Sequence, residues 1–76
     1  MYIVLEIQIN NDLTLLSWSF NNKNEAEAKY YTILSVAALS TIPKHGAVLL
    51  AENGCTLLNQ IYTHPMLEEN DTTKIN

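Results

Sequence analysis

Two histidines are the residues of this chain best suited to chemistry, because imidazole can exchange a proton near neutral pH and can bind metal ions. His45 and His64 lie at the two ends of a predicted β-hairpin, so strand pairing would bring them together near Lys44 or Tyr62. Such a group could form a small acid–base or metal site. Two ligands without a third or fourth do not hold a metal well, and we expect two surface histidines at strand ends instead.

The other reactive side chains fit structural roles better than catalytic ones. Cys55 is the single cysteine. His64, which could activate it, lies at the far end of the same predicted strand, where each intervening residue adds about 3.3 Å to the separation. Glu25 and Glu27 fall on different sides of a predicted helix, where they favour its first turn. The sequence has no glycine-rich phosphate loop and no paired-cysteine motif. It therefore predicts a non-enzymatic protein without catalytic residues, cofactor or metal.

Charge and hydropathy exclude two classes of partner. Eight acidic residues and four lysines give a formal net charge of −4, and there is no arginine. Nucleic-acid binders carry a basic stripe, so we expect no nucleic acid here, and Tyr30-Tyr31 is a poor stacking platform without basic neighbours. No apolar run approaches the ~20 residues of a membrane helix, and the start MYIVLEIQIN lacks the features of a signal peptide. A lone cysteine suits a reducing compartment, so we expect a soluble, cytoplasmic protein.

Alternating apolar residues predict an antiparallel hairpin at the start of the chain. The isoleucines and leucine of residues 3–9 recur at every second position, which is typical of a strand. Asn10 to Asp12 predicts a turn, since Asn and Asp accept left-handed backbone. Residues 13–20 form a second predicted strand, with Leu16, Trp18 and Phe20 on one face.

A helix is predicted next. Asn24 is a suitable N-cap with Glu27 three positions on. Pro43 disfavours helix at Ile42, so the helix should end by about Thr41. One stripe at helical spacing predicts the buried side. It consists of Ala26, Tyr30, Ile33, Leu34, Ala37 and Thr41.

A second hairpin follows the helix. Residues 44–52 and 55–64 predict two strands joined by Asn53-Gly54, a strong turn signal. Pro65 ends the last strand, and we expect residues 66–76 to be a disordered acidic tail. The sequence thus predicts a single α+β domain over residues 1–65: β-β-α-β-β, a four-stranded antiparallel sheet with one helix packed on a face.

The apolar residues exceed what this architecture can hide. Both faces of each predicted strand carry apolar side chains, and a chain of 76 residues rarely builds a sufficient core alone. On the helix, Tyr31, Val36 and Leu39 lie outside the predicted buried stripe. We therefore expect a homo-oligomer, most simply a dimer, which associates through the second half of the helix or the open sheet face. The predicted interface residues are Tyr31, Val36, Leu39 and Trp18.

The run NEAEAKYYTILSVAALSTIPKHGAVLLAENG, after the opening YIVLEIQIN, resembles a group of small uncharacterised proteins from phages and prophages of gut Firmicutes. The resemblance extends from Tyr2 to about His64 and has no catalytic motif attached to it. It implies a phage-encoded accessory or virion-associated protein that acts in the host cell and contacts a phage or host protein.

Two functions are compatible with these patterns. The first is a non-enzymatic assembly or protein-interaction module that self-associates. The alternative is a small-ligand or regulatory binding module, with a pocket between helix and sheet near Tyr30, Trp18 and Tyr62.

Overall fold

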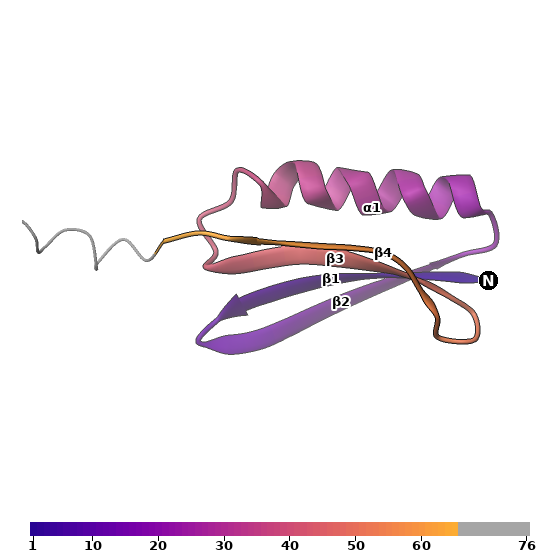
Figure 1. Cartoon of the computed structure of the whole chain (residues 1–76), viewed down its shortest axis with the longest axis horizontal. Coiled ribbons are helices and arrows are strands. Elements are labelled where there is room, and N and C mark those ends of the chain that lie inside the picture. The colour runs from indigo at the N-terminus through magenta and orange to yellow at the C-terminus, as the bar shows by residue number, and fades with distance from the viewer. Residues whose placement is uncertain (66–76) are drawn as a thin grey trace, which may run out of the picture.

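The computed structural model describes residues 1–65, and the predicted tail, residues 66–76, lies outside them. The described residues confirm the predicted β-β-α-β-β order, with the helix on one side of a four-stranded antiparallel sheet (Figure 1). The strands lie in the order β2-β1-β3-β4. The elements are β1 (Tyr2–Asn10), β2 (Asp12–Phe20), α1 (Lys23–Ala37), β3 (Lys44–Ala51) and β4 (Thr56–Thr63).

Two tight turns form the hairpins. Asn11 joins β1 to β2 in left-handed backbone (φ 72°), and these strands pair without interruption from Tyr2↔Phe20 to Asn10↔Asp12. In the β3–β4 turn Gly54 has φ 92°, and the Asn53 side chain accepts a hydrogen bond from the Cys55 amide at 3.1 Å. Both turns use the residue types that tolerate positive φ. The β3–β4 ladder contains an irregularity between Leu49 and Leu50.

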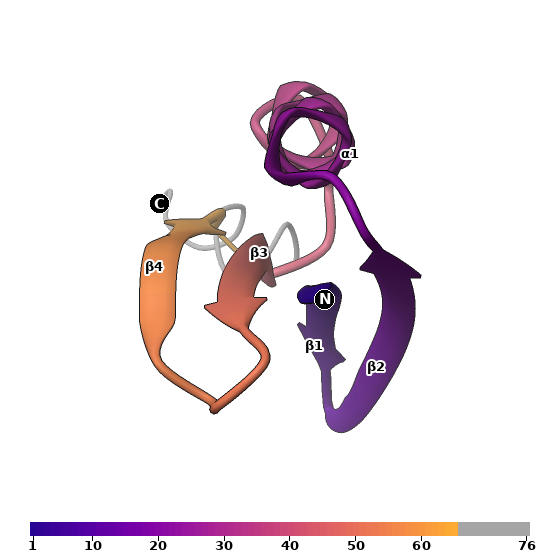
Figure 2. The same ribbon diagram turned by 90° about the vertical axis from the view of Figure 1, so that its right-hand side faces the viewer.

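The pairing of β1 with β3 joins the two hairpins into one sheet. These strands are separated in sequence by β2 and α1, and they pair antiparallel from Tyr2↔Ala51 to Ile9↔Lys44. The long connection is α1, which runs back above the sheet over β1 and β3 (Figure 2). The edges of the sheet are therefore β2 and β4.

The helix begins earlier than the sequence predicts. Its N-cap is Asn22, whose side-chain oxygen accepts hydrogen bonds from the amides of Asn24 and Glu25 at 2.7 and 3.1 Å. Asn24 was therefore the wrong choice of cap. Both asparagines satisfy the capping rule, and the end of β2 at Phe20 selects the earlier one.

The helix ends before the predicted limit of about Thr41, so the inclusion of Thr41 in the buried stripe was wrong. The helix stops at Ala37, and the amides of Leu39 and Ser40 then bond to carbonyls three residues back, which tightens the last turn. The Ser40 hydroxyl accepts a hydrogen bond from the Ile42 amide at 2.9 Å, and this contact directs the chain toward β3. Thr41 lies outside the helix and is exposed.

A small core lies between α1 and the two central strands. The helix buries four residues of the predicted stripe, whereas Leu34 is half-buried. Because several core side chains are alanines, helix and sheet can approach closely. The buried apolar residues are Val4, Ala26, Tyr30, Ile33, Ala37, Ala47 and Leu49. Within residues 1–65, no helix is long and apolar enough to cross a bilayer.

Gly46 in β3 generates a stability prediction. A β-carbon at this position would lie 2.1 Å from the Gln60 carbonyl oxygen and 2.6 Å from the Ile61 Cα, so Gly46→Ala must displace β4. We expect the free energy of unfolding in urea to fall by about 1–3 kcal/mol, as for other overpacked sites.

The matched control is Gly54→Asn in the β3–β4 turn. Nothing lies within 4 Å of the added β-carbon there, so the cost is limited to the strain of a side chain at φ 92°, and Asn is among the residues that best tolerate positive φ. We therefore expect Gly54→Asn to lose less stability than Gly46→Ala. If Gly46→Ala lost no more stability than Gly54→Asn, close approach of β3 and β4 would contribute nothing beyond backbone strain.

Candidate functional site

The sheet has one face away from the helix, which we call the open face. Side chains alternate along each strand, and directly paired residues share a face. Ile7, for example, lies between Leu15 on β2 and Gly46 on β3. On this basis the open face comprises Ile3, Leu5, Ile7, Ile9, Leu13, Leu15, Ser17, Ser19, Lys44, Gly46, Val48, Leu50, Asn59, Ile61 and Thr63.

The open face is mostly apolar and carries one charged residue, Lys44, among those named above. Its outer positions are the most accessible: Leu13, Leu15 and Ile61 are 59%, 53% and 42% exposed. The isoleucines of β1 are half-buried, because neighbouring strands flank them on both sides. A contiguous apolar surface on a four-stranded sheet is what interaction sites present.

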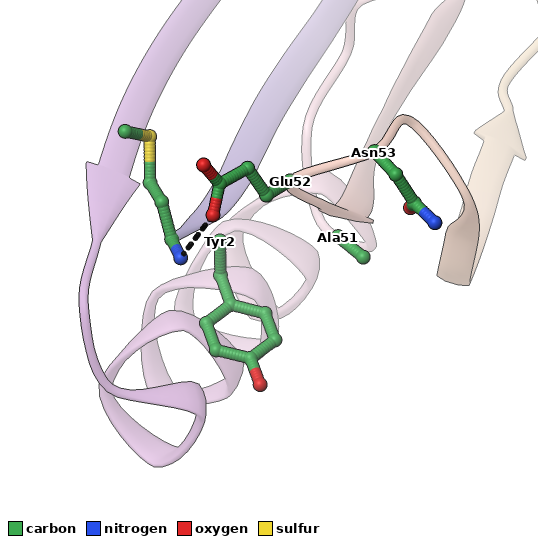
Figure 3. A pocket seen from close by; sticks show the side chains of 5 residues that line it. Tyr2, Ala51, Glu52 and Asn53 are labelled. Carbon is green, nitrogen blue, oxygen red and sulfur yellow. Dashed lines mark hydrogen bonds and ion pairs between the residues drawn. The ribbon is translucent and has the colours of Figure 1, made fainter.

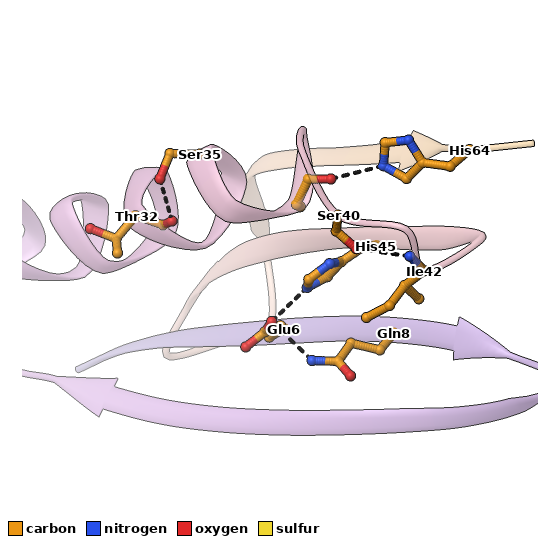
Figure 4. A network of polar contacts seen from close by, with 9 residues as sticks. Glu6, Gln8, Thr32, Ser35, Ser40, Ile42, His45 and His64 are labelled. Carbon is orange, nitrogen blue, oxygen red and sulfur yellow. Dashed lines mark hydrogen bonds and ion pairs between the residues drawn. The ribbon is translucent and has the colours of Figure 1, made fainter.

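The opposite face, beneath the helix, contains a polar cluster of Glu6, Gln8 and His45. The His45 side chain is 3% exposed, and its Nε2 lies 2.6 Å from Glu6 Oε2 (Figure 4). The Gln8 side-chain amide donates to the same carboxylate oxygen at 3.0 Å. The polarity of the sheet is therefore reversed at this end: its polar groups face the helix, and its isoleucines face away.

His45 corrects the prediction of two surface histidines, since it is buried. A carboxylate oxygen accepts, so the His45 Nε2 carries the hydrogen of the contact with Glu6. His45 Nδ1 has no hydrogen-bond partner among the described residues and is buried. A bare lone pair at Nδ1 costs less than a buried N–H without an acceptor, which favours the Nε2–H form of the ring.

His64 has a separate role at the end of the helix. Its Nε2 donates to the Ala37 carbonyl at 2.8 Å, and its ring stacks on Tyr62 with 6.5 Å between centroids. The two histidines thus bind different partners. Within the part of the chain that the structure describes, no group of three His, Cys, Asp or Glu residues could hold a metal ion. Cys55 is exposed just before β4.

The predicted interface residues lie in two environments. Tyr31, Val36 and Leu39 are 55%, 57% and 88% exposed on the helix side of the molecule. Trp18 instead packs against the edge of the core, with Lys29 Nζ 4.1 Å from its ring centroid. Their part in an interface stays a prediction. The signal for the open face was present in the alternation of β1, but the sequence did not show which of its two faces the helix covers.

The space expected for a ligand, between helix and sheet, contains the buried ring of Tyr30, which is 3% exposed. A pocket of about 470 Å³ lies elsewhere, at the end of the sheet where β1 begins and β3 ends (Figure 3). An ion pair of 3.1 Å between the Met1 amino group and Glu52 spans part of it. The residues lining it are Met1, Tyr2, Ala51, Glu52 and Asn53.

Comparisons with known proteins give no match to this chain: no family model, no curated protein and no solved structure.

The buried contact between His45 and Glu6 can be tested by paired substitutions. Glu6→Gln retains a side-chain oxygen that can accept from His45, whereas Glu6→Ala leaves the buried N–H without an acceptor. We expect Glu6→Ala to lower the free energy of unfolding by about 1–3 kcal/mol more than Glu6→Gln, measured in urea. Equal losses would show that the hydrogen bond contributes little.

The buried phenol of Tyr30 leads to a prediction of how the free energy of unfolding changes at alkaline pH. Burial, with smaller contributions from Tyr31 and Tyr62, raises the pKa of the Tyr30 phenol above its ordinary value of 10.0. The unfolded chain therefore loses this proton first, so Tyr30 contributes stability below pH 10 that is lost as the pH rises further.

Urea denaturation from pH 8 to 11 checks this expectation. The Tyr30→Phe variant cannot ionise at this position, so its stability should fall less steeply above pH 10 than that of the wild type. Parallel curves for the two proteins would contradict a contribution from Tyr30.

Proposed function

We propose that this protein is a non-enzymatic, self-associating module whose open face packs against the same face of a second copy. The reversed polarity of the sheet is the observation that supports the proposal. A lone molecule would expose Leu13, Leu15 and Ile61 to water while burying His45 and Glu6. A second sheet placed over the open face removes this conflict, because both sides of β1 and β3 are then covered.

The size of the open face suits such a pairing. Four strands spaced about 4.8 Å apart and about eight residues long, at about 3.4 Å per residue, present roughly 500 Å² on one side. Two such faces together bury roughly 1,000 Å², which is about the lower bound for a stable biological interface.

The distribution of charge favours a second copy over a partner of opposite charge. The chain carries a net charge of −4, yet the acidic residues of the strands, Glu6 and Asp12, both lie on the covered side of the sheet. Two acidic chains can therefore meet through their open faces without bringing carboxylates into the contact. A twofold axis pairs this surface with itself, as in most dimers.

The resemblance to phage and prophage proteins supports the biological setting of the proposal. In that setting the module is a phage-encoded accessory or virion-associated protein in the cytoplasm of the host cell. The helix side of the assembly, with Tyr31, Val36 and Leu39, then stays available to a phage or host protein.

The open-face contact can be tested with the double variant Leu13→Thr, Leu15→Thr. Both leucines are more than half exposed, and threonine keeps a high strand propensity, so the fold should be retained. By size-exclusion chromatography with light scattering, we expect wild type to have at least twice the chain mass of 8.6 kDa. The double variant should have at most half the wild-type mass.

Leu39→Thr is the matched control, since it makes the same substitution at an exposed leucine beyond the end of the helix. It should leave the mass of the assembly unchanged. If Leu39→Thr alone halved the mass, the contact would lie on the helix side instead. Wild type at 8.6 kDa at micromolar concentration would refute self-association.

A further inference from the structure

The outer edge of β2 is a second surface that the open face does not include. An edge strand presents unpaired backbone N–H and C=O groups, which can pair with another strand. β2 is nine residues long, it pairs with β1 along its whole length, and α1 lies over the central strands (Figure 2). From Asp12 through Ser17 its residues are all exposed.

β2 also lacks the features by which proteins protect their sheet edges. Natural edge strands carry lysine, proline, a bulge or an inward-pointing charge. The sequence DLTLLSWSF contains no basic residue, no proline and no glycine, and its single charge, Asp12, is at its first position. The other edge strand, β4, differs, since its ladder with β3 is irregular at Leu49/Leu50 and Pro65 follows it closely.

We propose that β2 pairs antiparallel with β2 of a second copy, so that two chains form one continuous eight-stranded sheet. In an antiparallel pair of two identical strands, each step forward along one strand is matched by a step back along the other. The numbers of any two opposed residues therefore add up to the same total. All nine residues of β2 find a partner only when Leu16 lies opposite Leu16 of the second copy, because Leu16 is the centre of the strand.

The side chains are compatible with this register. Leu16 is 43% exposed on the helix side of the sheet, and its contact with the same leucine of the second copy would cover it. Leu15 would lie opposite Ser17 of the second copy, and Asp12 opposite Phe20, so no like charges meet. Apolar cross-strand pairs add to the backbone hydrogen bonds.

This edge contact goes beyond the pairing of open faces and does not depend on it. The edge contact uses the backbone N–H and C=O groups at the outer edge of β2, whereas the open-face contact uses side chains on one face of the sheet. Leu16 does not belong to the open face, so the Leu16 variants below test the edge contact by itself.

Disulfide trapping tests the register directly. In a Cys55→Ser background, which removes the single native cysteine, Leu16→Cys places two thiols opposite each other at the axis. Directly opposed residues of antiparallel strands have Cα atoms about 4.5–5.5 Å apart, within the range that a disulfide spans. We expect a disulfide-linked dimer in a glutathione redox buffer, seen on a non-reducing gel.

Two matched variants control for chance collisions. Thr14→Cys lies on the same face of β2, but its equivalent in the second copy is four residues out of register, about 13 Å away along the strand, so it should not link. Gln60→Cys lies on the same side of the sheet at the centre of β4. Linking of Thr14→Cys as fast as Leu16→Cys, or of Gln60→Cys alone, would overturn the proposal.

A second measurement does not rely on thiols. Leu16→Lys places two ammonium groups opposite each other at the axis, so the mass of the assembly by light scattering should fall at least twofold. Gln60→Lys adds the same charge to β4 and should leave the mass unchanged. An unchanged mass for Leu16→Lys would refute the edge contact, whatever the state of the open face.

Discussion

A single helix can cover only one face of a four-stranded sheet, and this constraint determines the rest of the structure. An α-helix with its side chains is about 10 Å wide, whereas the outer strands of such a sheet lie about 14 Å apart. Helix α1 therefore buries side chains of β1 and β3 most completely, such as Val4, Ala47 and Leu49. Everything on the far side of the sheet lies outside this core.

The two proposed contacts use two parts of the sheet that the helix leaves free, namely its open face and its β2 edge. Each contact is a twofold pairing of a surface with itself. When two such axes cross at right angles, four chains close into an assembly of finite size; when they do not cross, the chains extend into a fibre or layer.

The sequence predicts the order of elements well and their boundaries less well. Period-two alternation identifies the hairpins, since a strand exposes successive side chains to opposite faces. The helix cap is ambiguous because Asn22 and Asn24 obey the same rule, and the last helical turn is lost because the chain must reach the start of β3. The burial of His45 could not be predicted, because it depends on Glu6, 39 residues away, and thus on the pairing of β1 with β3. The same long-range pairing decides which face of β1 becomes the open face.

The hydrogen bond between Glu6 and His45 affects which face of β1 packs beneath the helix. Hydrophobicity alone would favour the opposite face of β1 beneath the helix, since Leu5 and Ile7 are more hydrophobic than Glu6. Slipping β1 by one residue would place those side chains under the helix and leave His45 facing isoleucine, a buried imidazole with no acceptor. This one polar contact therefore fixes which face of β1 lies beneath the helix, and the more apolar face becomes the open face.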